Sequence, residues 1–168
     1  MGTMRTTFII DESGIIEENQ TASAADFDVL LKDICLEAVE VNFIAPHDAV
    51  NIAELLLNYA KKSNQNIAEI RASVNFDPIG HFALYGKFCD QEQKLFDDVK
   101  SLIEKTKDAT AFKPVIIHGN YFKNAGVTIA EEIGISMSMC SEYLAKLTDA
   151  GLDAKLVNSK MRFNLGVG

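Results

Sequence analysis

Short runs rich in β-branched and aromatic residues alternate along the chain with longer segments whose apolar residues recur every three or four positions. The short runs are typical of strands, and we expect five, at residues 6–10, 38–44, 69–76, 115–118 and 162–165. The longer segments predict helices at about residues 23–36, 48–63, 90–107, 128–150 and 153–160. A chain-breaking turn is expected at residues 77–80, followed by a loop or a short helix up to residue 88. This strand–helix–strand order, without hairpin turns, favours a parallel sheet.

Several helix ends carry sequence signals of their own. Ser23 and Asp48 stand where N-caps are expected. Thr128, followed three positions later by Glu131, matches a capping box, and Gly151 is the expected stop at the far end of the same helix. The long helix at about residues 128–150 is therefore the best marked element of the chain.

Two architectures fit this alternation. One is an open doubly wound sheet complete in this chain, and the other is part of a (β/α)8 barrel, which normally needs ~250 residues. Polar residues stand near the carboxyl ends of the predicted strands, at Asn42, Asn75, His118 and Asn164. In both architectures a ligand binds at those strand ends.

Composition narrows the class of protein. The 168 residues are 48% hydrophobic, and 16 Lys+Arg against 24 Asp+Glu give a net charge of −8, so we expect one α/β region over residues 1–168. The acidic balance argues against a nucleic-acid partner. The lack of a run of ~20 apolar residues argues against a membrane span, and the N-terminus does not resemble a signal peptide. Three widely spaced cysteines favour reduced thiols in a cytoplasmic protein.

Few residues stand out as candidates for chemistry. The chain contains no dinucleotide-binding glycine motif, phosphate loop or nucleophile elbow, and its three histidines lack metal-ligand spacing. His118, at a strand end, could donate a proton or bind a carbonyl oxygen, or it could be hydrogen-bonded within the rim of the sheet. Asp77, before Pro78, is first a turn residue, and a catalytic role is the alternative.

Four segments in the same order resemble the methylmalonyl-CoA mutase family. Residues 71–80 (RASVNFDPIG) are similar to that family's S-[IV]-N/G-F-D-P stretch, and residues 121–128 (YFKNAGVT) to its H-x-A-G-A element. Residues 142–152 (EYLAKLTDAGL) match the family's E-Y-L-x-x-L-T-D-A-G. Residues 161–167 (MRFNLGV) resemble its [IL]-x-F-x-x-G-[IV] strand. The resemblance runs from about residue 38 to the end.

The resemblance implies a TIM barrel and the radical isomerisation of methylmalonyl-CoA and succinyl-CoA with adenosylcobalamin. Three active-site positions of the catalytic subunits are substituted here. Asn75 stands for a Gln that contacts substrate, Tyr85 for an Arg that pairs with the substrate carboxylate, and Tyr121 for a His beside the thioester carbonyl. A phenol replaces neither a bidentate guanidinium nor an imidazole. The chain also lacks the cobalt-binding D-x-H-x-x-G motif.

These departures favour a fragment of the small, non-catalytic subunit, an incomplete barrel of about five parallel strands. We then expect it to have no catalytic residue of its own, to bind no cofactor or metal, and to support a large subunit that holds adenosylcobalamin in a heterodimer. One alternative is a divergent catalytic acyl-CoA mutase barrel that uses His118 or Tyr121. Another is a stand-alone binding module of flavodoxin-like topology.

Overall fold

The computed structural model describes residues 23–45 and 48–167. The strand expected at residues 6–10 lies outside these ranges. The described helices are α1 (Ala24–Leu30), α2 (Ala49–Lys62), the 3-10 helix η1 (Ile67–Glu69), α3 (Pro78–Tyr85), α4 (Glu92–Lys105), α5 (Asn120–Asn124), α6 (Ile129–Asp149) and α7 (Ala154–Ser159). The described strands are β1 (Val41–Asn42), β2 (Ala72–Ser73), β3 (Val115–His118) and β4 (Met161–Asn164).

The four described strands are parallel and follow one another in chain order. β1 pairs with β2, and β3 pairs with β4 over four residues. Two single parallel bridges, Ala72 to Phe112 and Phe76 to Val115, join β2 to the segment of β3. The spatial order is therefore β1-β2-β3-β4, with no reversal. The expected parallel sheet is confirmed, although its ladders are shorter than the apolar runs that predict them.

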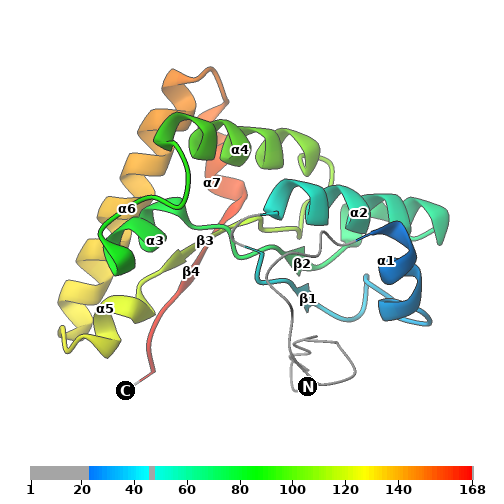
Figure 1. The fold of residues 1–168 in the computed structure, drawn as a ribbon, viewed down its shortest axis with the longest axis horizontal. Coiled ribbons are helices and arrows are strands. Elements are labelled where there is room, and N and C mark those ends of the chain that lie inside the picture. The colour runs from blue at the N-terminus through cyan, green and yellow to red at the C-terminus, as the bar shows by residue number, and fades with distance from the viewer. Residues whose placement is uncertain (1–22, 46–47, 168) are drawn as a thin grey trace.

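The long helices lie on one side of these strands. Figure 1 shows α2, α4 and α6 in an arc over the strands. Each helix packs on the next along the arc: α1 on α2, α2 on α4, and α4 on α6. The core fills the space between this arc and the strands, and fully buried side chains of α2, α4 and β3 belong to it: Leu56, Val99, Leu102, Ile103, Val115 and Ile117. Burial of these side chains is the main stabilising contribution.

The other side of the strands is concave. Because side chains alternate along a strand, Arg162 of β4 and its register partner Ile116 of β3 share one face, as do Asn42 of β1 and Ser73 of β2. The Arg162 guanidinium nonetheless reaches β1, where its Nη2 lies 2.9 Å from Asn42 Oδ1. Neighbouring strands are ~4.8 Å apart, so three flat spacings would exceed the reach of this side chain. The sheet must curve around Arg162.

Most predicted helix signals are confirmed. Ser23 caps α1, and Thr128 forms a complete capping box with Glu131 at the start of α6. Gly151 follows α6 with a positive φ of 93°, the backbone conformation expected at a helix stop. Asp48 stands at the start of α2 but makes no capping hydrogen bond to the helix, and its carboxylate accepts a bond from the Asn51 side chain instead.

Three helical features differ from the sequence prediction. α1 ends at Leu30 rather than near residue 36, and Asp33, just beyond it, adopts a left-handed φ of 62° that a continuing helix does not allow. The short helix expected before residue 88 is confirmed as α3, but it begins inside the turn expected at residues 77–80, because Asp77 caps it and Pro78 fits its first turn. α5 is an additional short helix after β3. Among the described residues, no helix is long and apolar enough to cross a membrane.

Candidate functional site

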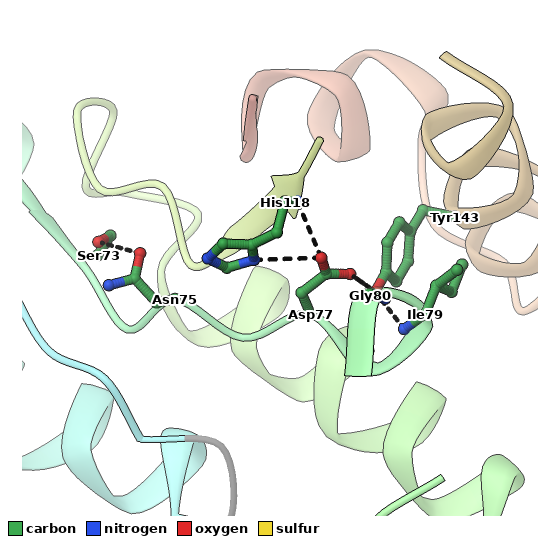
Figure 2. Close-up of polar contacts among 7 residues, drawn as sticks. All are labelled: Ser73, Asn75, Asp77, Ile79, Gly80, His118 and Tyr143. Carbon is green, nitrogen blue, oxygen red and sulfur yellow. Dashed lines mark hydrogen bonds and ion pairs between the residues drawn. The ribbon is translucent and has the colours of Figure 1, made fainter. Parts of the chain in front are cut away.

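Asp77 is the centre of a buried hydrogen-bond network at the carboxyl ends of β2 and β3. Its Oδ1 accepts bonds from the Gly80 N–H at 2.9 Å and from the Tyr143 hydroxyl at 2.7 Å. Its Oδ2 accepts a 2.9 Å bond from the His118 N–H, and the His118 ring Nδ1 lies 3.2 Å away (Figure 2). Asp77 also serves as the N-cap of α3, so the expected turn role is confirmed and extended.

Tyr143 connects this network to the long helix α6. Its side chain is fully buried, and its oxygen accepts a 3.0 Å bond from the Ile79 N–H while its hydroxyl donates to Asp77. Burial, with the nearby negative charge of Asp77, raises the pKa of Tyr143 well above its ordinary value. Tyr143 therefore stays a neutral hydrogen-bond donor.

His118 lies on the concave face at the end of β3, since it shares its side of the strand with Ile116. Its side chain is 12% exposed. The ring stacks face to face on Tyr121, with centroids 4.9 Å apart and 7° between the planes. The sequence interpretation of His118 as a hydrogen-bonded residue at the sheet rim is confirmed by these contacts. Within residues 23–45 and 48–167, no hydrogen bond reaches the other ring nitrogen.

Asn75 adopts a left-handed φ of 49°, which is uncommon for a residue other than glycine. It stands between β2 and Asp77, where the chain turns from the strand into α3. The Ser73 hydroxyl lies 3.4 Å from Asn75 Oδ1 and 2.6 Å from Asn42 Oδ1. Two of the polar strand ends, Asn42 and Asn75, are thus brought together around one hydroxyl.

Tyr121 and Tyr85 lie beside the network without bonding to Asp77. Burial raises the pKa of Tyr121, and the nearby Asp77 and Tyr85 add to this shift. Tyr85 is 63% exposed at the end of α3, and its ring contacts His81 with centroids 4.6 Å apart. The structure therefore places four of the candidates, Asp77, His118, Tyr121 and Asn75, at one end of the strands, with Tyr85 on the adjacent surface.

A second polar cluster lies deeper on the concave face. Arg162 pairs with Glu40 and reaches Asn42 at 2.9 Å and the Ser73 hydroxyl at 3.5 Å. Although partial burial opposes the effect, Arg162 holds the pKa of Glu40 below its ordinary value. The guanidinium is thus neutralised and largely bonded within the chain. No group of three or more His, Cys, Asp or Glu side chains among the described residues is arranged to hold a metal ion.

Sequence reasoning missed Tyr143 and Arg162 as members of these clusters. Tyr143 falls on the apolar face of a predicted helix and lies 66 positions from Asp77, so its spacing indicates only a core residue. Its place in the E-Y-L motif was the one available signal. Arg162 is a single cation in a predicted strand, and its partners Glu40 and Asn42 are about 120 positions away.

Comparisons with known proteins agree with the motifs. Residues 19–168 match the family model described as methylmalonyl-CoA mutase. The chain is also 29% identical over 140 residues to the methylmalonyl-CoA mutase small subunit of Porphyromonas gingivalis (strain ATCC BAA-308 / W83). That match covers 83% of this chain and 22% of the relative. Because the family model spans all of the described residues and most of the sequence, the chain belongs to the methylmalonyl-CoA mutase family.

Proposed function

We propose that this chain is part of a small, non-catalytic subunit that supports the large catalytic subunit of an adenosylcobalamin-dependent methylmalonyl-CoA mutase. In this proposal the heterodimer interconverts methylmalonyl-CoA and succinyl-CoA in the cytoplasm, and this chain contributes to its assembly. The proposal rests on family membership and on the side chains at the three substituted contact positions.

The environment of Tyr121 is the main observation in support of this proposal. The resemblance aligns Tyr121 with a His of the catalytic subunits. Its ring is held against His118, and its raised pKa makes it a poorer acid than an ordinary tyrosine, whose pKa is already ~10. General acid catalysis near neutral pH favours a group whose pKa lies close to the working pH. Tyr121 is therefore unsuited to replace an imidazole.

Tyr85 supports the same conclusion at the carboxylate position. It stands where the resemblance implies an Arg, and its exposed phenol lacks the charge and the paired N–H donors that bind a carboxylate. Asn75, the third substituted position, keeps an amide but on a shorter side chain than the Gln that it replaces. The substitution at Tyr85 thus weakens recognition of a substrate carboxylate, and those at Asn75 and Tyr121 change two other substrate contacts that the resemblance implies.

The arrangement of the strands supports a barrel sector over the flavodoxin-like alternative. In an open doubly wound sheet the strand order reverses at a switch point, and helices cover both faces. Here the described strands run in chain order, the long helices lie on one side, and Arg162 marks a concave other side (Figure 1). Consecutive order with outer helices is the pattern of a (β/α)8 barrel.

We propose that adenosylcobalamin is held by the large subunit. The two described histidines are already fixed within the chain: His118 Nδ1 lies 3.2 Å from Asp77 Oδ2, and His81 Nδ1 lies 3.2 Å from the Lys87 carbonyl oxygen. Each ring also packs on a tyrosine. His47, the remaining histidine, lies outside the described residues. Neither of the two stands in a D-x-H-x-x-G motif, and this absence supports placing the cofactor in the large subunit.

The test is co-expression of the full tagged chain with a catalytic large subunit, followed by co-purification and a mutase assay. We expect a stable complex and no turnover by this chain alone with methylmalonyl-CoA and adenosylcobalamin. Tyr121→Phe is the matched variant, because it keeps the ring and removes the hydroxyl, and it should change neither result. Turnover by the isolated chain that Tyr121→Phe abolishes would favour the divergent mutase, and failure to co-purify would contradict the supporting role.

A further inference from the structure

One flank of α6 carries no charged side chain. α6 stands at the end of the arc of long helices, and its Lys146 donates to Glu92 on the neighbouring α4 (Figure 1). Met137 lies nine residues before Lys146, about two and a half turns of helix, so its side chain points to the opposite side. We call this opposite side the outer flank, and it is marked by Ala130, Ile133, Met137, Ser141, Ala145 and Thr148.

The outer flank has the composition of a covered surface although it is largely exposed. The side chains of Ile133 and Met137 are 46% and 52% exposed, and Ala130, Ser141 and Ala145 are exposed as well. Residues 133–141 contain no charged side chain, whereas 24% of the whole chain is charged. The solvent face of a helix in a soluble protein normally carries charged and polar residues. This flank therefore lacks what keeps a helix face in water.

The hydroxyl groups on the outer flank can be buried without losing a hydrogen bond. The Ser141 hydroxyl donates to the Met137 carbonyl oxygen at 2.9 Å, and the Thr148 hydroxyl donates to the Leu144 carbonyl oxygen at 2.7 Å. Both bonds lie within α6, so they persist when another surface covers the helix. Burial of a polar group is costly mainly when it leaves the group without a partner. The flank can thus be buried almost as an apolar surface.

The outer flank is also complementary to itself. A two-fold axis that crosses α6 at the level of residue 139 would place a second α6 antiparallel to the first. Residues equally far from 139 on either side then lie opposite each other, so Met137 faces Ser141 of the partner subunit and Ile133 faces Ala145 of the partner subunit. Each large side chain meets a small one, as close packing of two helices requires. The match occurs twice, since a two-fold interface uses the same patch on both copies.

We propose that the outer flank of α6 is the interface of a homodimer, in which a second copy of this chain packs its own α6 antiparallel on the first. Charge favours this flank, because two copies that each carry −8 repel one another where charged surfaces meet. One helix flank supplies fewer residues than the ~20–30 per side of a standard interface, so we expect a weak dimer with a Kd on the order of 10 μM. This interface does not depend on the role of the chain as a small subunit.

The first test is sedimentation velocity of the full chain over about 1–200 μM, a range that brackets the expected Kd. The average mass should rise with concentration toward twice that of the monomer. Met137→Glu buries a carboxylate beside the two-fold axis in each copy and should weaken association at least about tenfold. Ile129→Glu is the matched control on the same helix, because Ile129 is 65% exposed but precedes the outer flank, and it should dimerise as the wild type does. A wild-type chain that stays monomeric, or a Met137→Glu variant that dimerises equally well, would overturn the proposal.

The second test traps the antiparallel register with a disulfide. Cys35 is an exposed thiol, so the background is Cys35→Ser, and two differently tagged chains carry Met137→Cys and Ser141→Cys. A disulfide needs Cα atoms within ~7 Å, and only the mixed pair places its cysteines opposite each other. The mixture should therefore cross-link at least about tenfold faster than either chain alone. Equal rates would overturn the proposal. So would a monomeric wild-type chain whose co-purification with the large subunit is lost in Met137→Glu, because the flank would then belong to that subunit.

Discussion

The hydroxyl of Tyr143 makes two buried hydrogen bonds and should contribute substantially to the free energy of unfolding. Tyr143→Phe measures this contribution, because it removes only the hydroxyl. The substitution keeps the buried ring and its contact with Phe96, whose centroid lies 5.8 Å away. It removes a 2.7 Å donor to the Asp77 carboxylate and a 3.0 Å acceptor for the Ile79 N–H. Both partners lie at the start of α3, so the change acts on the junction of α6 with the strand ends.

The magnitude follows from the two lost bonds. A hydrogen bond to a charged group contributes ~1.5–3 kcal/mol, and a buried donor left without a partner costs ~1–3 kcal/mol. Asp77 keeps three other contacts, which limits the first loss. We therefore expect Tyr143→Phe to lower the free energy of unfolding by about 3 kcal/mol, a large share of the ~5–15 kcal/mol typical of a domain.

Urea unfolding followed by circular dichroism measures this loss. With a denaturant slope of ~2 kcal/mol/M, the midpoint should fall by ~1.5 M. Tyr59→Phe is the matched control, because the Tyr59 hydroxyl donates to one neutral acceptor, the Leu31 carbonyl, in a partly buried position. It should cost only ~1 kcal/mol. If Tyr143→Phe and Tyr59→Phe lower the free energy of unfolding by the same amount, the bond to Asp77 contributes no more than an ordinary neutral hydrogen bond, which would contradict the prediction.

Three further predictions concern other buried contacts. Lys160 is 1% exposed, and its ammonium donates to the backbone carbonyl oxygens of Thr106 at 2.5 Å and Ala109 at 2.6 Å. Burial, together with the nearby positive charge of Lys113, lowers the pKa of Lys160 from 10.5 to about 8. Between pH 8 and 10.5 the unfolded chain therefore binds more protons than the folded chain, and the free energy of unfolding should rise with pH by at most about 3 kcal/mol. In urea unfolding, Lys160→Met should remove this rise. Gly119→Ala would place a Cβ 2.3 Å from Ser136 Oγ and should lower the free energy of unfolding by ~1–3 kcal/mol. Gly134 lies inside α6, and a Cβ there would meet no atom within 4 Å, so Gly134→Ala should stabilise the chain by ~0.5–1 kcal/mol. Thermal unfolding measures both. Arg162→Ala should cost only ~1 kcal/mol, because its side chain is 37% exposed, and double-mutant cycles with Glu40→Ala measure the coupling.

Each of these predictions has a contrary outcome. An unchanged pH dependence in Lys160→Met would assign the alkaline rise to other groups. If Gly119→Ala is as stable as Gly134→Ala, then Ser136 of α6 is not in close contact with the turn at Gly119 between β3 and α5. A coupling energy near zero between Arg162 and Glu40 would show that this ion pair, which joins β4 to the start of β1, adds no stability.

The sequence predicts the long elements well and the local ones poorly. α4 and α6 are found within two residues at each end, because periodic apolar faces and capping residues act together there. α5 was missed, since five residues are too few to show a helical period. α1 ends early although Ile34 continues its apolar spacing, because Asp33 leaves the helical region of backbone angles.

The site shows a different limit. Asn75 and His118 lie at strand ends, as the alternation of elements predicts, and ligand binding at that end stays a prediction. The bonds between the candidates depend on backbone details that spacing does not encode, such as the left-handed turn at Asn75. The link from Asp77 to Tyr143 depends on how α6 packs, which only the folded chain determines.

The reach of Arg162 across the concave face has a consequence for association. Its bonds to Asn42 and Ser73 tie β4 to β1 and β2, so the bend of the sheet is set by contacts inside this chain. The outer edge of β4, unpaired among the described residues, is therefore held at a fixed angle. A further strand that pairs with this edge would meet a sheet whose curvature is already fixed. Less conformational entropy is then lost on binding than with a flat and flexible sheet.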